Sequence, residues 1–416
     1  MLLRVVKIAL AMFLIGLLTS CAPHPGRAMT LSVSSDGQYA VTANENDEVL
    51  LWNIPRRSYQ LISSHANGYN AYFIRGTHNF LWQGEDNTVH VQTISGKRLL
   101  SFKTKQTSYY GIITKNLRYF FYSDKYWNVY RYDTQEHHSK VLTHEAYASY
   151  IFAGKPINMS FSNNEKHLLT SGFCDEKFQA IQIGQPNAKL NLNCVTLWNV
   201  DTGKPIKKYG GNHMASQTYA TISPNGHYVL AGDINGGGGL WSIPQNKMIY
   251  RNMSFQGKLV KVGKEKFAWD KKGFPAIPTD FRDGNGSMHG EIFSLKYITQ
   301  DQYLRFTTWI PYAVLYTGTD PKPTKYLRLG LNPAPSVVDY AADQSIDTSP
   351  SAHILVTGQA VSDGINVYQY NPKTQILYLV WSPILHSGSV KPAVTNKVSL
   401  LPGASAKKLV EVKHEW

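Results

Sequence analysis

LSVSSDGQYAVTANENDEVLLWNIPRRSYQLI, residues Leu31 to Ile62, is the stretch that decides the fold. It contains four short runs rich in β-branched, aromatic and leucine residues: LSVS, YAVTAN, VLLWNI and SYQLI. Runs of this kind between turn-forming residues are typical of strands. Asp36 and Gly37 supply a tight turn between the first two runs. The stretch therefore predicts a four-stranded meander.

The same pattern returns further along the chain. From Tyr219 it reads YATIS, PNGH, YVLAGD, GGLWSI and KMIY, with Pro-Asn-Gly at the tight turn. Over Met159–Tyr209 it reads MSFS, NNEKH, LLTSG, VTLWNV and KPIKKY. Four weaker copies follow the same template, among them YFIRGTHNFLWQGE with VHVQTI and SIDTSPSAHILVTG with VYQYNP. The pattern predicts an array of seven copies.

One position in the third run of each copy carries a large side chain. Along the chain it is held by Trp52, Gln92, Tyr132, Trp198, Trp241, Tyr316 and Tyr370. A basic period of about 40 residues with four strands in each copy is the signature of a propeller blade. A single four-stranded sheet cannot bury both of its faces, so the copies must stack around an axis. We expect an all-β propeller of seven four-stranded blades, with an eighth blade as the alternative.

From Leu31 to Pro383 the chain resembles the WD-repeat family. The resemblance lies in the four-strand pattern and in the tryptophan that ends the third strand of several copies. The Gly-His dipeptide that opens a family repeat is missing, and the family's Trp-Asp ending reads Trp-Asn or Trp-Ser. The resemblance implies the family's fold and leaves its usual hydrogen-bond network in doubt.

The first twenty residues have the features of an export signal. Arg4 and Lys7 precede the apolar run Ile8 to Leu18, which is too short to span a bilayer. The sequence LTSC that follows resembles the bacterial lipobox, which implies that Cys21 is acylated and anchors the chain to lipid. The alternative is an ordinary secretory signal followed by an unrelated cysteine.

The remaining chain divides into three parts. Residues 21–30 form a short lipidated tether, residues 31–389 the propeller, and residues 390–416 a tail that closes the ring or starts a further blade. Ala22 stands where an aspartate would resemble an inner-membrane retention signal, so an outer-membrane location facing the periplasm is expected. The formal net charge of +14 favours acidic partners, or is a solubility charge spread over many loops.

Two insertions interrupt the period, at about 173–194 and 251–290. Cys174 and Cys194 bracket the first insertion, and in an oxidising compartment such a pair predicts a disulfide. Two free thiols or a metal-binding pair are the alternatives. The second insertion mixes cations with aromatic residues, which suits a partner-binding surface or a flap packed on its own blade. The candidate binding residues there are Trp269, Lys271, Lys272 and Phe274.

Catalytic motifs are missing from the sequence. It contains no GxSxG, HExxH or GxxxxGK[ST] motif, which carry nucleophile, zinc and phosphate chemistry. Asp283, Asn285 and Ser287 have the spacing of the start of a calcium loop, but the glycine and the final glutamate are out of place. We expect no metal, no cofactor and no catalytic residues.

Broad, rigid faces built from loops suit a non-catalytic scaffold. We expect the chain to hold other envelope proteins, possibly acidic ones, and no specific nucleic acid. Its layout is similar to that of the propeller lipoprotein of the outer-membrane barrel-assembly machinery, or of an accessory subunit of a secretion complex. The alternatives are a module that binds an anionic polymer or glycan, and a hydrolase or lyase. An enzyme would need Asp, Glu and His side chains converging at the channel mouth, which we do not expect.

Overall fold

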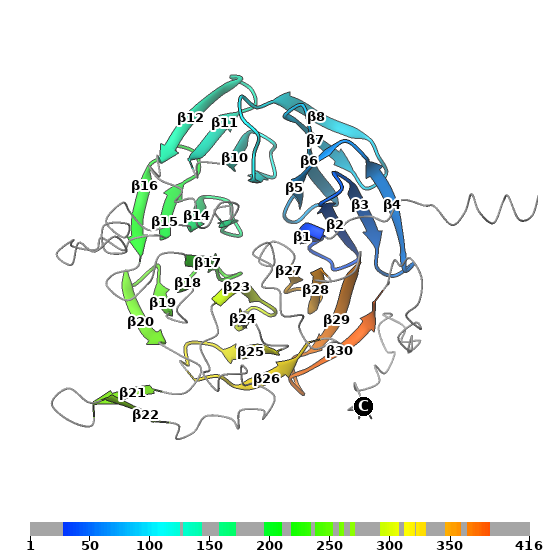
Figure 1. The fold of residues 1–416 in the computed structure, drawn as a ribbon. Helices are drawn as coiled ribbons and strands as arrows, with labels where there is room; N and C mark the ends of the chain where they lie inside the picture. The colour runs from blue at the N-terminus through cyan, green and yellow to red at the C-terminus, as the bar shows by residue number, and fades with distance from the viewer. Residues whose placement is uncertain are drawn as a thin grey trace, which may run out of the picture.

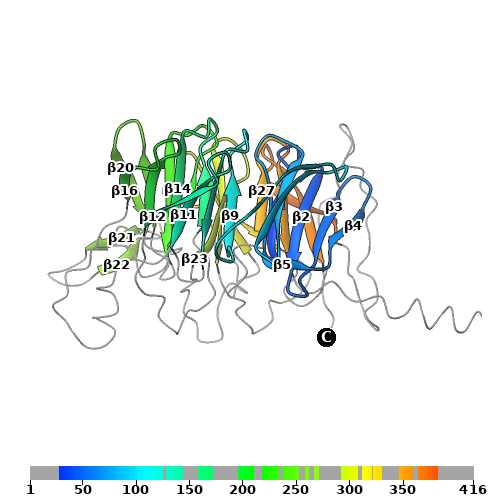
Figure 2. The same ribbon diagram turned by 90° about the horizontal axis from the view of Figure 1, so that it is seen from above.

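The computed structural model describes residues 28–124, 128–143, 158–171, 195–209, 218–233, 238–252, 258–261, 267–270, 292–307, 312–320, 322–329, 346–358 and 364–382. These residues form seven antiparallel four-stranded sheets arranged around a central axis (Figure 1). Viewed at right angles, the strands run roughly along that axis, so that the turns lie on two opposite faces (Figure 2). The predicted seven-bladed propeller is confirmed.

Each blade is a meander whose first strand lies nearest the axis and whose fourth strand lies at the rim. Blade 1 consists of β1 (Ala28–Val33), β2 (Tyr39–Asn44), β3 (Val49–Asn53) and β4 (Ser58–Ser63). Blade 2 consists of β5 (Ala66–Phe73), β6 (Asn79–Gly84), β7 (Thr88–Thr93) and β8 (Arg98–Lys103). Blade 3 consists of β9 (Tyr110–Ile113), β10 (Tyr119–Ser123), β11 (Val129–Asp133) and β12 (His138–Thr143). Blade 4 consists of β13 (Asn158–Phe161), β14 (His167–Ser171), β15 (Val195–Asn199) and β16 (Pro205–Tyr209).

The remaining three blades follow the same order. Blade 5 consists of β17 (Thr218–Ile222), β18 (Tyr228–Asp233), β19 (Gly238–Ser242) and β20 (Lys247–Asn252). Blade 6 consists of β23 (Ile292–Tyr297), β24 (Gln302–Thr307), β25 (Tyr312–Thr317) and β26 (Lys325–Arg328). Blade 7 consists of β27 (Ile346–Ser349), β28 (Ile354–Gly358), β29 (Ile365–Asn371) and β30 (Ile376–Trp381). Between blades 5 and 6 a hairpin of β21 (Lys258–Lys261) and β22 (Phe267–Asp270) belongs to no blade.

The repeated large residue lies in the third strand of every blade, as predicted. In blade 1 Trp52 pairs with Ala40, and its Nε1 donates a buried hydrogen bond of 3.0 Å to Thr42 Oγ1. Trp198 makes the equivalent bond of 2.9 Å to Thr170 Oγ1. In blade 7 the equivalent position is held by Tyr368, which pairs with Leu355 of β28, and not by the predicted Tyr370. The tryptophan therefore fixes the second strand to the third in two blades.

The apolar core lies between neighbouring blades rather than in one central mass. One cluster joins blade 7 to blade 1 through Val367, Trp381 and Trp52, and the two tryptophan rings are 6.0 Å apart. Another joins blade 4 to blade 5 and contains Leu197 and Trp241. Each blade thus buries its faces against its two neighbours, which is how a ring of sheets covers the apolar surface that one sheet leaves exposed.

The turn between the first two strands is built in the same way in several blades. Ser34 Oγ donates a 2.6 Å hydrogen bond to Asp36 Oδ1, and the backbone N–H of Tyr39 donates to Ser34 Oγ. Gly37 has a φ of 70°, which favours glycine at this place. The predicted turn at Asp36 and Gly37 is therefore confirmed. The equivalent pairs are Thr114 with Asn116, Ser162 with Asn164, and Ser223 with Asn225.

These turns mark one face of the ring, which we call the turn face. Alternation of strand direction places the start of β1, at Ala28, on the opposite face. The strand ends that flank the two predicted insertions, at Ser171 and Val195 and at Asn252 and Ile292, also lie on that opposite face. The described part of the chain contains no helix long and apolar enough to cross a membrane.

Candidate functional site

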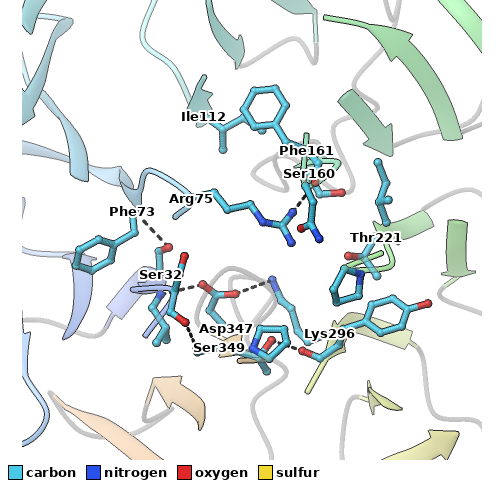
Figure 3. A pocket seen from close by; sticks show the side chains of 18 of the residues that line it. Ser32, Phe73, Arg75, Ile112, Ser160, Phe161, Thr221, Lys296, Asp347 and Ser349 are labelled. Atoms are coloured by element: carbon cyan, nitrogen blue, oxygen red, sulfur yellow. Dashed lines mark hydrogen bonds and ion pairs between the residues drawn. The ribbon is translucent and has the colours of Figure 1, made fainter. Parts of the chain in front are cut away.

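A cavity of about 570 Å³ lies on the axis of the ring, and all seven blades contribute to its wall. The lining residues come from the innermost strands and from the turns that follow them, including Ser35, Lys115 and Pro224. The mouth of the cavity therefore opens on the turn face. Figure 3 shows that charged and hydroxyl side chains from different blades point toward its centre.

Arg75 follows β5 and extends into this cavity (Figure 3). Its Nη1 donates a 2.7 Å hydrogen bond to the backbone carbonyl of Phe161, which connects blade 2 to blade 4. Burial lowers the pKa of the Arg75 guanidinium, and the carboxylates of Asp347 and Glu165 oppose that shift. An arginine side chain remains protonated in proteins even when it is buried, so Arg75 places a positive charge at the axis.

Asp347 of blade 7 interacts with residues of blade 6 and blade 1. The Lys296 Nζ lies 3.8 Å from Asp347 Oδ1, and the backbone N–H of Val33 donates a 2.8 Å hydrogen bond to Asp347 Oδ2. Ser349 Oγ also donates a 2.5 Å bond to the carbonyl of Ser35. Side chains at the cavity mouth thus contribute to ring closure between blades 7 and 1.

Glu165 is the other carboxylate of the cavity. Its Oε2 accepts a 2.8 Å hydrogen bond from the backbone N–H of Lys115. Burial raises the pKa of Glu165, opposed by that hydrogen bond and by the charges of Arg75 and Lys115. Among the described residues no histidine lines the cavity, and no group of three His, Cys, Asp or Glu side chains could hold a metal ion. The described lining therefore carries hydrogen-bonded carboxylates and cations, with no histidine to pair with a nucleophile.

The outermost strands of the seven blades form what we call the outer wall: β4, β8, β12, β16, β20, β26 and β30. Every large apolar side chain that is clearly exposed in the described part of the chain lies on this wall. These residues are Tyr59 (47% exposed), Leu61 (50%), Leu99 (37%), Ile206 (50%) and Met248 (38%). The rim is thus the most apolar accessible surface that the structure describes.

Five of the seven outer-wall strands carry cations, whereas β4 and β30 carry no charged residue. Within their bounds the seven strands contain no aspartate and no glutamate. They contain the cations Arg98, Lys103, Lys140, Lys207, Lys208, Lys247, Arg251, Lys325 and Arg328. A surface of one charge sign steers oppositely charged partners toward it. These cations are far apart in the sequence, and the folding of the blades places their strands on one surface.

Of the four residues predicted to act in binding, Trp269 is the one that lies in the described part of the chain. Trp269 lies on β22, where it pairs with Leu259, and the hairpin lies outside the ring (Figure 1). Lys271, Lys272 and Phe274 lie outside the described residues. Cys21, Cys174 and Cys194 lie outside them as well, so lipidation and the disulfide stay predictions.

The comparisons with known proteins concern the fold. The β-propeller domain of Myceliophteria thermophila Cps50 (Swd1) is similar, with a TM-score of 0.56 and 10% sequence identity, over 83% of this chain and 97% of that one. Similarity at this identity shows the architecture alone. No protein-family model and no curated protein matches the sequence. The chain has the fold of a seven-bladed β-propeller.

Proposed function

We propose that this WD40-like propeller is a non-catalytic scaffold, anchored in the outer membrane through an acylated Cys21, that holds acidic proteins of an envelope assembly. The observation that carries the proposal is the outer wall, where exposed apolar side chains stand among lysines and arginines with no carboxylate. Protein interfaces combine apolar anchors with charges that select the partner. A barrel-assembly or secretion-system complex is the expected setting.

The proposed docking site combines the part of the wall on blades 4 and 5 with the predicted binding residues of the insertion that follows β20. Ile206 and Lys208 are exposed on β16, and Lys247 and Met248 are exposed on β20. We call these four residues the wall patch. The Lys207 Nζ donates a 3.2 Å hydrogen bond to the carbonyl of Asn246, which places the two strands side by side. An acidic protein surface with an apolar centre is the complement of this patch.

The anchor would orient the ring. Six residues separate Cys21 from Ala28, the first residue of β1, and the chain between these two Cα atoms spans at most roughly 25 Å when fully extended. Since β1 starts on the face opposite the turn face, that opposite face lies near the lipid and the turn face points away. The outer wall then stands roughly perpendicular to the membrane, where it is open to periplasmic proteins.

The test is capture of partners from solubilised membranes by two matched variants. Ile206→Ser with Lys208→Glu changes the wall patch. Leu61→Ser changes an equally exposed apolar residue on β4, a strand without charged residues. Surface changes of this kind alter stability by only about 0.5 kcal/mol. Loss of a stoichiometric acidic partner in the first variant alone supports the proposal.

Two outcomes would count against it. Equal capture by both variants would remove the wall patch as the docking site. Recovery of an anionic polymer or glycan without a stoichiometric protein, with binding that weakens steeply as salt is added, would favour the alternative binding module.

A further inference from the structure

The axial cavity contains a cation whose hydrogen-bonding capacity is mostly unused. A guanidinium has five N–H donors. In the described residues Arg75 donates only to the carbonyl of Phe161, and no carboxylate oxygen lies within 4.0 Å of it. Figure 3 shows the rest of the guanidinium directed into the open cavity. A backbone carbonyl is neutral, so the charge of Arg75 is left without a paired anion.

The two carboxylates of the cavity already have partners. Asp347 interacts with Lys296 and with the backbone N–H of Val33, and Glu165 accepts a hydrogen bond from the backbone of Lys115. Both carboxylates act on the charge of Arg75 through space, but neither forms an ion pair with it among the described residues. Among the described residues the cavity cations without an ion pair are therefore Arg75 and Lys115, and Arg75 is the one whose planar guanidinium can bind a carboxylate through two donors.

Hydroxyl groups surround the same space. Ser32 Oγ accepts a hydrogen bond from the Phe73 N–H, which leaves its own O–H to donate. Ser160 Oγ is buried without a hydrogen-bond partner among the described residues, and Thr221 lines the cavity from blade 5. Several O–H donors beside an arginine are the groups that an oxyanion needs.

We propose that the axial cavity binds a small solute through a single carboxylate on Arg75. The planar guanidinium can hold both carboxylate oxygens at once. A cavity of about 570 Å³ is within the usual range for small-molecule sites. Asp347 and Glu165 lie in the same cavity, so they repel a doubly charged anion such as phosphate more than a single carboxylate. This site is independent of the wall patch.

The probes are N-acetylglycine, its neutral amide N-acetylglycinamide, and inorganic phosphate, each titrated into the protein by calorimetry or ligand-observed NMR. Arg75→Gln keeps a donor for the Phe161 carbonyl but removes the charge. Arg98→Gln is the matched control, because Arg98 is exposed on β8. N-acetylglycine should bind the wild type and the control equally, and at least about tenfold more weakly to the Arg75 variant.

Four results would overturn the assignment. N-acetylglycine could bind the Arg75 variant as tightly as the wild type, or the neutral amide could bind as tightly as the acid. Failure of the wild type to bind N-acetylglycine in the millimolar range would also exclude the site. Tighter binding of phosphate, lost in the same variant, would show an anion site of a different class.

Discussion

Asp347 of the last blade accepts a 2.8 Å hydrogen bond from the backbone N–H of Val33 in the first blade. The same carboxylate faces Lys296, so one side chain connects blades 6, 7 and 1. We predict that Asp347→Ala lowers the free energy of unfolding by about 1–3 kcal/mol, because it leaves a polar group at the blade junction without its partner. Chemical denaturation checks this. Asp201→Ala, at an exposed turn, is the control and should change stability by about 0.5 kcal/mol or less.

Trp52 and Trp82 form a natural pair for testing the inter-strand bond. Trp52 is 1% exposed and bonds to Thr42, whereas Trp82 is 9% exposed and donates a 3.2 Å bond to Gln92. Trp52→Phe should lower stability by at least about 1 kcal/mol more than Trp82→Phe, since it leaves a cavity and a buried hydroxyl without its partner. Urea denaturation of both variants measures the difference. Equal losses would show that the buried bond adds nothing to stability.

His167 gives the fold a dependence on pH. Burial, with the neighbouring charge of Lys166, lowers the pKa of His167 in the folded state. The unfolded chain, with a histidine pKa of about 6.5, then binds the proton more readily. Stability should fall as the pH drops from about 7 through 6.5 toward the folded-state pKa. His167→Gln should reduce the loss in urea midpoint between pH 7.5 and pH 5.5. An unchanged loss would show that other groups cause it.

The lipid anchor can be tested by one substitution. Cys21→Ser should move the protein from the membrane fraction to the soluble periplasmic fraction, because the proposed lipid anchor requires this thiol. Cell fractionation with immunoblotting measures the distribution. Persistence of the variant in the membrane would count against lipidation at Cys21.

The inserted hairpin provides a second test of partner binding. Replacing both Trp269 and Phe274 with alanine should abolish partner capture and leave the Tm unchanged, because Trp269 lies on a hairpin that belongs to no blade. Thermal denaturation and co-purification are measured on the same preparation. A large fall in Tm would show instead that the insertion belongs to the core.

The blades could be predicted because their signals are local. The turn at Asp36 and Gly37 and the third-strand position of Trp52 each depend on residues within one copy, and both are confirmed. The shift in blade 7 from Tyr370 to Tyr368 could not be predicted, because both residues are tyrosines in the same alternating strand and only strand pairing separates them.

The cavity could not be predicted from the pattern. Arg75, Lys296 and Asp347 belong to blades 2, 6 and 7, and only closure of the ring brings them together. The basic outer wall did have a signal in the sequence. The fourth strand of every copy lacks Asp and Glu, and five of these strands contain Lys or Arg.

The most direct measurement of the central claim is site-specific photo-cross-linking in intact cells. A photoreactive amino acid replaces Ile206 or Met248 on the wall patch, or Leu61 on β4 as the control. We predict a discrete protein adduct from the two patch positions and none from Leu61, with mass spectrometry identifying a partner of acidic surface. Adducts of equal strength from all three positions, or none from Ile206 and Met248, would contradict the proposal that the outer wall of blades 4 and 5 holds a partner.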